Sequence, residues 1–575
     1  MRIGVSLHNV QRSRWRIGLA VAVAALCILL DILLVVSLAA VLVIAVTGGG
    51  VVHVLGVTVR ARGVENPLWL LTGVVVLRYA LRGWPVLGFR RWPVDTFVNS
   101  GTDLVAKQLP ARFTAPFRRP VFGLACLAVV VFLLRVLLAW TSPGFFSGDD
   151  VEIHEMTLGV LLHKPWPVWN LRSAFFPMVF VYPAQWLALA LGASSPEKLV
   201  LAGRVAVALV STVAIPLTWW TARRLPSTDS RLAALSVVFL AINKLQMSFG
   251  SSELPRPVST VFVLAAFLCL LHGRVLQSAA AGVLLGIAVA CRFSEIVFVP
   301  SALVILGRER RWTHAVVASL TVALTSVAIL GVSDALYWGR PFSSLAAAVD
   351  YTLVRGQSSR GYEPVWEYLR IIPAWSTLVF VALALAGSSR RTPESWWLWL
   401  PIAMLSLLPH KESRYLLPVI PFLCIAAARG FLRVADWIGR SSEAIGWRGW
   451  GRDLFAPLFL LAVLHEIGGW RLIRSNEGIR LAHYLRVTGG VGIAAQDVWR
   501  LGGRPYLWPL EPIVEVSPTL LADPSELAAA VRDAKWVALR YRVARTAGDP
   551  AMHEIGFERD PAWHGEDYVL YVRVR

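Results

Sequence analysis

Long apolar stretches, separated by short polar segments, run along most of the chain. A helix needs about 20 mostly apolar residues to cross a bilayer, so we interpret runs of about 18 or more as membrane spans and shorter runs as candidates. The pattern predicts a polytopic α-helical membrane protein with about 13 transmembrane helices. They lie near residues 17–47, 66–81, 121–140, 203–221, 232–247, 258–271, 279–291, 294–306, 313–333, 371–387, 395–409, 415–430 and 453–470.

Two apolar stretches fit this scheme less simply. The run 17–47 contains Asp31 and is compatible with one long tilted helix or with a hairpin. Residues 176–193 are also apolar enough for a span, but a crossing there would reverse the side of every later loop. We therefore predict that 176–199 lies along, or dips into, the outer leaflet.

The pattern changes toward the C-terminus. Between residues 480 and 575, short β-like runs and one helical patch replace the long apolar runs, which predicts a small α/β domain outside the membrane. The chain thus divides into an N-terminal extension (1–120) with a basic cytoplasmic loop, a transmembrane domain (121–470) and this C-terminal domain (480–575). The β-like runs are Val491–Ala495, Ile513–Val516, Trp536–Tyr541 and Tyr568–Val574, and the helical patch is Ser525–Lys535.

Composition supports a lipid environment. Apolar residues make up 56% of the chain and charged residues 16%, whereas about a quarter of a soluble globular protein is charged. The 56 Lys and Arg outnumber the 36 Asp and Glu, and a soluble protein with this excess would be expected to bind nucleic acid. Here the basic residues lie in loops between apolar runs, so we predict no nucleic-acid partner. The five cysteines lie in apolar stretches and indicate neither a disulfide framework nor a zinc site.

The basic clusters also predict the topology, because loops rich in Lys and Arg remain on the cytoplasmic side. We place the clusters on the cytoplasmic face of the plasma (inner) membrane, which leaves the other loops outside. The clusters are Arg12–Arg16, the Arg-rich stretch 82–120, Arg223–Arg224, Arg308–Arg311, Arg390–Arg391 and Arg429–Arg440. The predicted outer segments are 141–202, 248–257, 292–294, 334–370, 408–414 and everything after 471.

The most informative motif is FFSGDDVEIHE, residues 145–155, directly after the span near 121–140. It carries four carboxylates within seven residues: Asp149, Asp150, Glu152 and Glu155. Carboxylates at a membrane edge are costly unless they face water, a cation or a polar substrate. A solvated acidic loop is the simpler alternative. We refer to residues 145–155 as the acidic segment.

Ionisable residues also stand later in the same predicted outer loop, where Arg172 lies, and at the ends of the other outer loops. Each alone is typical of a snorkelling side chain or a local ion pair. The topology puts all of them on the same side as the acidic segment, so we expect them to converge on one cavity. They are Arg172, Glu253, Arg256, Arg292, Asp334 and the corner His410-Lys411-Glu412-Ser413-Arg414-Tyr415, here called the basic corner.

Basic side chains and a carboxylate beside lipid suit one class of reaction. Arg binds a phosphate bidentately, Lys binds it as a point charge, and a carboxylate can deprotonate an acceptor hydroxyl. A sugar carried on a lipid phosphate requires both groups near the membrane plane. The sequence has neither a DxD motif at a strand end nor a Gly-rich phosphate loop, so it gives no sign of a nucleotide-sugar donor.

The basic corner, followed by Pro418 and Pro421, resembles the HKExRF…P..P signature of family 22 glycosyltransferases. These are polytopic dolichol-phosphate-mannose mannosyltransferases with the membrane GT-C fold. The resemblance covers roughly residues 120–430, with Tyr415 in place of the usual Phe and Asp149-Asp150 in place of the usual Asp-Glu pair. Further matches in the expected order are Arg172-Ser173 before Phe176-Pro177, Glu253 with Arg256, Arg292-Phe293, and Asp334 with Tyr337-Trp338-Gly339.

The resemblance implies transfer of a sugar from a polyprenyl-phosphate donor to a glycan or glycolipid acceptor on the extracytoplasmic face, with inversion. Mannose is the sugar that it favours. We expect Asp149 to be the general base, with Asp150 as its neighbour and substitute. The carboxylates leave a divalent cation as an open option, and no metal ligand is assigned. The residues expected to hold the donor phosphate are Lys411, Arg414, Arg256 and Arg292, and those expected to contact substrate are Glu152, Glu155, Arg172, Glu253, Asp334, His410 and Glu412.

Other interpretations stay open at this level. A GT-C enzyme of the same design could carry arabinose or aminoarabinose, or act on a lipid or protein acceptor. A multi-pass transporter would also have many helices, but it usually shows inverted repeats and charges near the bilayer midplane. A non-catalytic scaffold is the remaining alternative. The high ratio of Arg to Lys favours a bacterial source, and hence a bacterial polyprenyl phosphate.

Overall fold

The computed structural model describes residues 120–164, 166–226, 230–355, 362–444, 461–470 and 476–574, together with Phe459, a few isolated positions before 75 and one hairpin. The hairpin pairs β1 (Gly50–Val54) with β2 (Val57–Ala61). The predicted spans near 17–47 and 66–81, like most of the N-terminal extension, lie outside the described residues.

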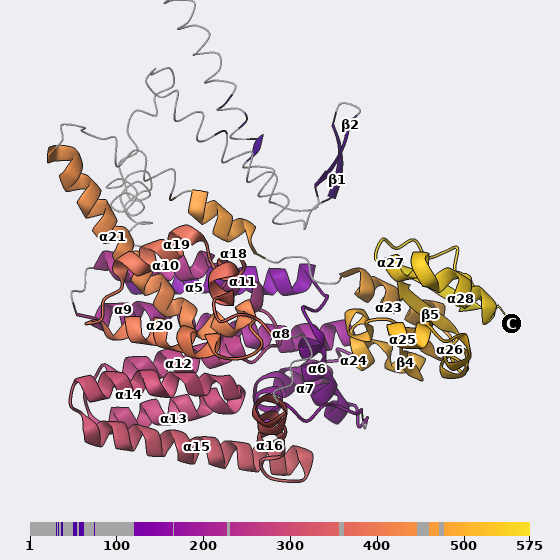
Figure 1. The fold of residues 1–575 in the computed structure, drawn as a ribbon, viewed down its shortest axis with the longest axis horizontal. Helices are drawn as coiled ribbons and strands as arrows, with labels where there is room; N and C mark the ends of the chain where they lie inside the picture. The colour runs from indigo at the N-terminus through magenta and orange to yellow at the C-terminus, as the bar shows by residue number, and fades with distance from the viewer. Residues whose placement is uncertain are drawn as a thin grey trace, which may run out of the picture.

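Most of the described chain is a bundle of apolar helices that run side by side (Figure 1). The C-terminal sheet lies beyond one end of this bundle, at the right in Figure 1, and the loop between α14 and α15 lies at the opposite end. The bundle helices are α5 (Pro120–Thr141), α8 (Pro196–Thr212), α9 (Ala214–Arg224), α10 (Ser230–Ile242), α12 (Arg256–Leu270), α13 (Val275–Cys291), α14 (Phe298–Arg308), α15 (Trp312–Trp338), α19 (Leu378–Gly387), α20 (Pro393–Ser406) and α21 (Ile420–Ala444).

In the part of the chain that the structure describes, four helical segments are long and apolar enough to cross a membrane. They are Val121–Thr141, Pro196–Arg224, Trp312–Trp338 and Ser413–Trp437. The predicted number of about 13 spans is therefore not reached by this measure. Several predicted spans form shorter helices because polar residues interrupt them. Asn243 interrupts the run 232–247 and caps α11 (Lys244–Phe249). Thr377 interrupts the run 371–387 and caps α19.

The ambiguous stretch 176–199 is a separate short helical segment. It consists of η1 (Pro177–Val181) and α7 (Tyr182–Ala190), and the chain turns at Gly192, which has a φ of 91°. Ser195 then caps α8, its side chain accepting a hydrogen bond from the backbone of Lys198. The segment is thus not continuous with α8, and its place in the outer leaflet stays a prediction.

Glycines allow two bundle helices to approach closely. A Cβ on Gly387 of α19 would overlap the carbonyl oxygen of Ala426, and a Cβ on Gly430 of α21 would overlap that of Leu383. Small residues at such contacts let membrane helices gain van der Waals packing that larger residues prevent. This pair joins α19 and α21 beside Leu383, Ala384 and Ala426 of the largest apolar cluster of the described residues.

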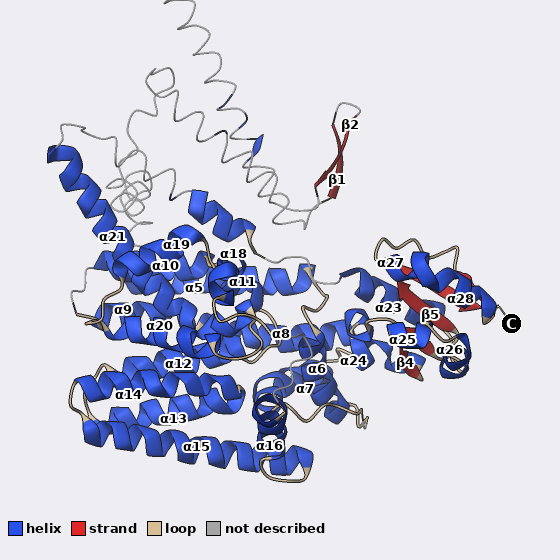
Figure 2. Cartoon of the chain, in the orientation of Figure 1, coloured by secondary structure: helices blue, strands red, loops and turns tan. Residues whose placement is uncertain are grey.

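Residues 476–574 form a mixed five-stranded sheet with short helices (Figure 2). The strand order is β4-β3-β5-β7-β6; β3 is parallel to both its neighbours, and β7 is antiparallel to both of its own. Each of the four predicted β-like runs contains a strand, and α26 (Pro524–Ala530) lies in the predicted helical patch. The strands are β3 (Ile493–Ala495), β4 (Ile513–Glu515), β5 (Trp536–Arg540), β6 (Phe557–Arg559) and β7 (Tyr568–Arg573).

The contact between α19 and α21 yields a stability prediction. We expect Gly430→Ala to destabilise the protein by about 1–3 kcal/mol, because the added methyl group forces the two helices apart. The measurement is the midpoint of thermal unfolding in detergent micelles. Gly123→Ala on α5 is the control, since nothing lies within 4 Å of the added Cβ there. Equal midpoints for the two variants would contradict the proposed close packing.

Candidate active site

The acidic segment begins a helix instead of forming an open loop. α6 (Gly148–Leu161) starts immediately before Asp149 and Asp150, whose negative charges in the first turn favour the helix N-terminus. Asp150 accepts hydrogen bonds from the backbone N–H of Phe146 and the hydroxyl of Ser147, both at 3.0 Å. Helical spacing therefore puts Asp149 and Glu152, three residues apart, on one face, where both pair with Arg172, and turns the adjacent Asp150 to another face. The interpretation as a loop did not anticipate this division.

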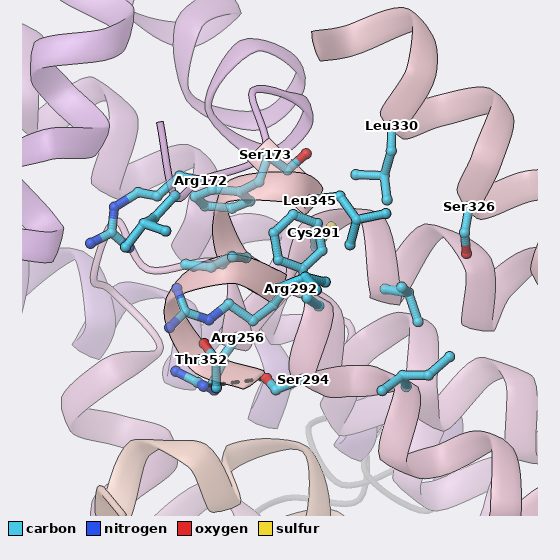
Figure 3. Close-up of a pocket in the computed structure, with 18 of the residues that line it drawn as sticks. Arg172, Ser173, Arg256, Cys291, Arg292, Ser294, Ser326, Leu330, Leu345 and Thr352 are labelled. Atoms are coloured by element: carbon cyan, nitrogen blue, oxygen red, sulfur yellow. Dashed lines mark hydrogen bonds between the residues drawn. The ribbon is translucent and has the colours of Figure 1, made fainter. Parts of the chain in front are cut away.

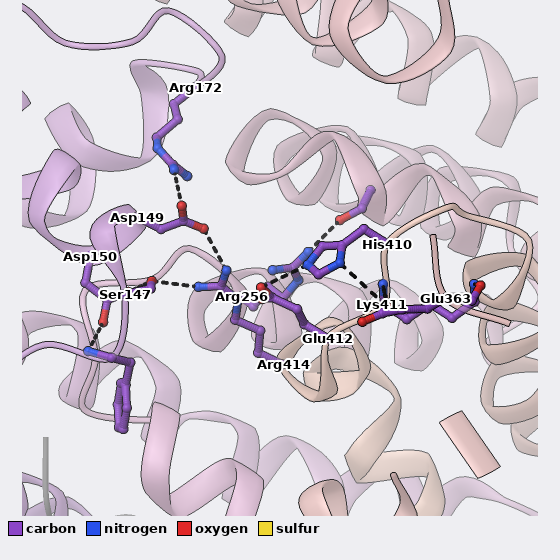
Figure 4. A network of polar contacts seen from close by, with 12 residues as sticks. Ser147, Asp149, Asp150, Arg172, Arg256, Glu363, His410, Lys411, Glu412 and Arg414 are labelled. Atoms are coloured by element: carbon purple, nitrogen blue, oxygen red, sulfur yellow. Dashed lines mark hydrogen bonds and ion pairs between the residues drawn. The ribbon is translucent and has the colours of Figure 1, made fainter. Parts of the chain in front are cut away.

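Asp149 connects the acidic segment to the basic corner. Its Oδ2 accepts a hydrogen bond from Nη2 of Arg414 at 2.8 Å, across 265 residues of sequence. Its Oδ1 accepts one from Nη2 of Arg172 at 2.6 Å, and the Nε of Arg172 donates to Glu152 at 2.5 Å. Nη1 of Arg414 also donates to Ser147 Oγ at 3.0 Å. Figure 4 shows Asp149 lying between the two guanidinium groups, so the expected convergence of acid and base is present.

The other residues of the basic corner divide into two groups. His410 lies 3.1 Å from Glu412 through Nε2, and Glu412 also pairs with Arg414. Lys411 turns the other way: its Nζ donates to the backbone carbonyls of Leu408 at 2.6 Å and Glu363 at 2.8 Å. Figure 4 shows Lys411 beside Glu363, away from Asp149. The structure therefore does not bring Lys411 to the other expected phosphate-binding residues.

Two further arginines lie together beside the basic corner. Arg256 begins α12, and its guanidinium carbon lies 4.0 Å from the centroid of the Tyr415 ring, while Nη2 donates to Ser294 at 3.3 Å. Arg292 follows α13 in an extended conformation, just before the short helix η2 (Phe293–Val297). Within the described residues, the guanidinium of Arg292 has no hydrogen bond or ion pair. It is therefore the arginine with donors available for a ligand.

These groups line one end of a cavity of about 810 Å³. The other end is apolar and is formed by α13, α15 and α16 (Ser343–Val349). Figure 3 shows the guanidinium groups of Arg172, Arg256 and Arg292 on one side, with Leu330 and Leu345 on the other. Seven expected site residues line the cavity: Asp149, Arg172, Arg256, Arg292, His410, Glu412 and Arg414.

Six expected site residues do not line the cavity, and their contacts explain why. Glu253 is fully buried and accepts hydrogen bonds from Nε and Nη2 of Arg204, at 2.9 and 2.8 Å. Asp334 accepts hydrogen bonds from the backbone and hydroxyl of Ser344, at 2.8 and 2.6 Å, and so caps α16. The other four are Asp150 and Lys411, described above, Glu152, which faces Arg172, and Glu155, which faces the C-terminal domain.

Sequence reasoning missed two residues that shape this region. Arg204 on α8 donates to the carbonyls of Pro143 at 2.9 Å and Gly144 at 2.8 Å, and so orders the chain that enters α6. Its signal in the sequence was a single charge inside an apolar helix, which usually marks a buried partner. Glu363 pairs with the backbone N–H of Lys411 and lies 3.6 Å from His410, and no motif indicated it.

The surrounding charges set the protonation of the two aspartates. Burial opposes ionisation of Asp149, but Arg172, Arg414 and Arg292 hold its pKa well below the usual range, so it is a carboxylate at physiological pH. Burial, followed by the charge of Glu253, raises the pKa of Asp150 to about 7. Burial and the neighbouring Arg256 and Arg172 lower the pKa of Arg292 to about 10, which leaves it charged at neutral pH.

The sequence left a divalent cation open. In the part of the chain that the structure describes, no three or more His, Cys, Asp and Glu side chains are grouped so that they could hold a metal ion. Asp149 and Glu152 face guanidinium groups instead.

Comparison with known proteins places these features in a family. The family model described as the Alg9-like mannosyltransferase family matches residues 150–469. An undecaprenyl phosphate-α-4-amino-4-deoxy-L-arabinose arabinosyl transferase of Pseudomonas aeruginosa is 25% identical over 412 residues, which cover 67% of this chain and 73% of that relative. The α-1,2-mannosyltransferase ALG9 of Arabidopsis thaliana is 25% identical over 322 residues, which cover 51% of this chain and 54% of that relative.

A solved structure shares the fold. The crystal structure of ArnT from Cupriavidus metallidurans bound to undecaprenyl phosphate superposes with a TM-score of 0.52 and 14% sequence identity. The match covers 79% of this chain and 98% of that chain. At this identity the likeness establishes the fold alone, which is the membrane GT-C fold of an integral membrane protein.

The raised pKa of Asp150 predicts a pH-dependent stability. The folded protein keeps this proton where the unfolded chain, with a pKa near 3.8, has lost it, so stability falls as pH rises from about 4 to about 7. Like the protonated form of Asp150, the Asn side chain of Asp150→Asn has an oxygen acceptor and a hydrogen-bond donor for the same neighbours. Unlike Asp150, it does not titrate. We expect the variant to be more stable than wild type at pH 8, by on the order of 1–4 kcal/mol.

The measurement is the midpoint of thermal unfolding at several pH values between 4 and 8. Asp533→Asn, at an exposed position of the C-terminal domain, is the control and should follow the wild-type slope. If wild type and Asp150→Asn have parallel pH profiles, the pKa of Asp150 is close to its ordinary value and the assignment is wrong.

Proposed function

Since the chain belongs to the Alg9-like mannosyltransferase family, we propose that it transfers mannose from a polyprenyl-phosphate donor to a glycan or glycolipid acceptor, with inversion at the anomeric carbon. Family membership makes the chain a glycosyltransferase of the membrane, so the transporter and scaffold interpretations are set aside. The proposal concerns the sugar, the lipid carrier, the acceptor and the residues that act.

One observation carries the proposal: a single cavity joins a cluster of arginines and a carboxylate to an apolar end. Arg292 has no hydrogen bond or ion pair among the described residues, and the Nε of Arg256 is buried without a hydrogen bond, 4.0 Å from Oε1 of Glu295. A phosphate monoanion or diester would supply acceptors to both guanidinium groups, and Arg is suited to this geometry. The apolar lining from α15 and α16 suits a hydrocarbon chain attached to the same phosphate.

The lipid carrier is also supported by two of the known proteins. The arabinosyl transferase relative is named for an undecaprenyl-phosphate sugar, and the ArnT structure that shares this fold was solved with undecaprenyl phosphate. A lipid phosphate bound at Arg256 and Arg292 would place its sugar between these arginines and Asp149, because all three residues line the same cavity.

We assign Asp149 as the base. Its carboxylate is ionised and its side chain is 26% exposed, so it can accept a hydrogen bond from an acceptor hydroxyl in the cavity. Its low pKa makes it a weak base, so the proton moves only once the forming bond has made the hydroxyl strongly acidic. As the hydroxyl oxygen bonds to the anomeric carbon, the bond from that carbon to the phosphate oxygen breaks and the hydroxyl proton passes to Asp149. Arg256 and Arg292 stabilise the negative charge that develops on the departing lipid phosphate. Attack opposite a β-linked phosphate gives an α-linked product.

Arg172 and Arg414 have a different assignment. Both guanidinium groups are paired with Asp149, at 2.6 and 2.8 Å, so they orient the base and keep it ionised. Lys411 is held by backbone carbonyls and is not assigned to the phosphate. Of the residues first expected to hold the donor, Arg256 and Arg292 are retained.

We propose that the site faces the extracytoplasmic side of the plasma (inner) membrane. The distribution of basic loops supports this orientation: the loop between α14 and α15, with Arg308–Arg311, lies at the end of the bundle opposite the C-terminal domain (Figure 1). Arg-rich loops remain on the cytoplasmic side. The acidic segment and the basic corner lie at the other end.

A second candidate sugar, 4-amino-4-deoxy-L-arabinose, is favoured by the extent of the similarity. The match to the arabinosyl transferase covers 67% of this chain, against 51% for the mannosyltransferase ALG9. Purified protein should be offered polyprenyl-phosphate mannose and polyprenyl-phosphate aminoarabinose separately, with lipid-linked glycans as acceptors. Transfer of mannose alone supports the first proposal, transfer of aminoarabinose alone supports the second, and transfer of neither overturns both.

The base assignment predicts a large loss of turnover. We expect Asp149→Asn to lower kcat by about 10²–10⁴-fold, because a general base typically contributes that much. Asn has nearly the same shape, so binding of the donor should persist. The measurement is the rate of sugar transfer at saturating donor. Turnover within twofold of wild type, with the protein folded, would remove Asp149 from this role.

The phosphate assignment predicts a loss of donor affinity. We expect Arg292→Gln to raise the KM for the lipid donor by about 10–100-fold, since a hydrogen bond to a charged group contributes about 1.5–3 kcal/mol. Arg223→Gln, an exposed arginine at the end of α9, is the matched control and should leave KM unchanged. Lys411→Gln should also keep the wild-type KM. A donor KM that changes for Lys411→Gln and not for Arg292→Gln would reverse the assignment.

A further inference from the structure

The C-terminal domain shares a hydrophobic core with the helix that carries Asp149. Phe145, Val151 and Leu158, which precede or belong to α6, are buried in one cluster with side chains of the C-terminal domain. Phe145 and Tyr506 form an edge-on ring contact at 5.9 Å. The buried residues that the C-terminal domain contributes include Ile479, Leu481, Leu485, Leu501, Tyr506, Leu507 and Leu510. The domain is thus packed into the catalytic region.

Polar contacts fix the same boundary, one before α6 and one in its middle. Before the helix, the backbone N–H of Gly144 donates to Asn476 Oδ1 at 3.0 Å. Further along, Glu155 Oε1 accepts the backbone N–H of Arg504 at 3.1 Å, and Nη1 of Arg504 lies 3.6 Å away. Glu155 therefore has a partner in the C-terminal domain and not in the cavity.

Gly503 brings the backbone of the C-terminal domain against side chains of α6. It begins α24 (Gly503–Leu507) with a φ of 61°, in the left-handed region. A Cβ at this position would overlap Cγ1 of Val151 and would stand 2.9 Å from Glu155 Oε1. Val151 is β-branched and 3% exposed, so it has little freedom to move away. Any larger residue at 503 must push α24 and α6 apart.

We propose that the C-terminal domain (residues 476–574) is a positioning element for catalysis: it holds α6 so that Asp149 faces the cavity. This inference rests on the proposed role of Asp149. Val151 and Glu155 lie about 3 Å and about 9 Å along the helix axis from Asp149. A displacement imposed at these two residues is therefore transmitted to the carboxylate. Arg256 belongs to α12 and Arg292 follows α13, so neither moves with α6.

The test compares two glycines of the same domain in the full-length protein. Gly503→Ala adds the overlap with Val151, whereas Gly489→Ala adds a methyl group at a φ of 73° with nothing within 4 Å. Both substitutions carry the same backbone strain. We expect Gly503→Ala to lower kcat by on the order of 10–100-fold with the donor KM unchanged, because a misplacement of about 1 Å has effects of this size. Gly489→Ala should retain wild-type kinetics.

Rescue separates positioning from general damage to the fold. The double variant Gly503→Ala with Val151→Ala removes the overlap and should recover most of the lost turnover. If Gly503→Ala does not fold, Glu155 supplies a second pair: Glu155→Gln keeps an oxygen acceptor for Arg504 and should stay active, whereas Glu155→Ala should lose turnover. Amounts of folded protein are compared by gel filtration and thermal unfolding.

The outcomes distinguish this inference from the proposed function. A wild-type protein that transfers no sugar overturns the proposed function. An active wild type, with Gly503→Ala and Gly489→Ala equally active, overturns the positioning role and leaves the proposed function intact. Loss of turnover that Val151→Ala does not rescue, with Glu155→Ala and Glu155→Gln equally affected, also overturns it.

Discussion

The pairing of Asp149 with Arg172 and Arg414 is the interaction on which the site depends. An unpaired charge is costly in a partly buried site at a membrane edge. Each of these three charges therefore needs an opposite charge beside it. The two ion pairs join α6, the loop before η1 and the start of the segment Ser413–Trp437. They also pair the guanidinium groups of Arg172 and Arg414, whereas we propose Arg256 and Arg292 for the donor phosphate. The division of the arginines into two roles follows from this pairing.

The second feature of the site, its apolar end, follows from close helix packing. Gly282 and Gly286 on α13 face Thr321 and Thr325 of α15, and a Cβ on Gly282 would overlap the Thr321 side chain. The close contact of α13 and α15 forms one wall of the cavity, and Asp334 at the end of α15 caps α16, which forms another. Asp334, expected at the substrate, instead positions the apolar wall. One cavity thereby receives both a charged and a hydrocarbon surface.

The C-terminal domain is packed against the same site. Its sheet is built from short strands with buried apolar side chains. α24 and the short helix η5 (Val498–Leu501) lie against α6, and α23 (Asn476–Thr488) contributes to the same buried cluster. Arg486 of α23 also pairs with Glu197 at the start of α8. Both α6 and α8 are therefore in contact with this domain. A rigid attachment of this kind is consistent with a structural role near the chemistry.

The sequence determined the class of the protein. Its apolar runs require lipid, its resemblance to family 22 glycosyltransferases was confirmed by the family match, and its alternating C-terminal pattern located four of the five strands in the C-terminal sheet. Charges placed on one side by the topology were enough to identify seven residues of the cavity. These features are local or periodic, so composition and spacing reveal them.

Only the tertiary structure decided what each charge does. Lys411 and Arg414 are three residues apart in one motif, yet one is held by backbone carbonyls and the other by Asp149. Asp149 and Asp150 are adjacent, yet the helix turns one toward the cavity and the other into the protein. The partner of a buried charge lies wherever the fold brings an opposite charge within about 3 Å. That distance depends on the packing of distant helices, which sequence spacing does not encode.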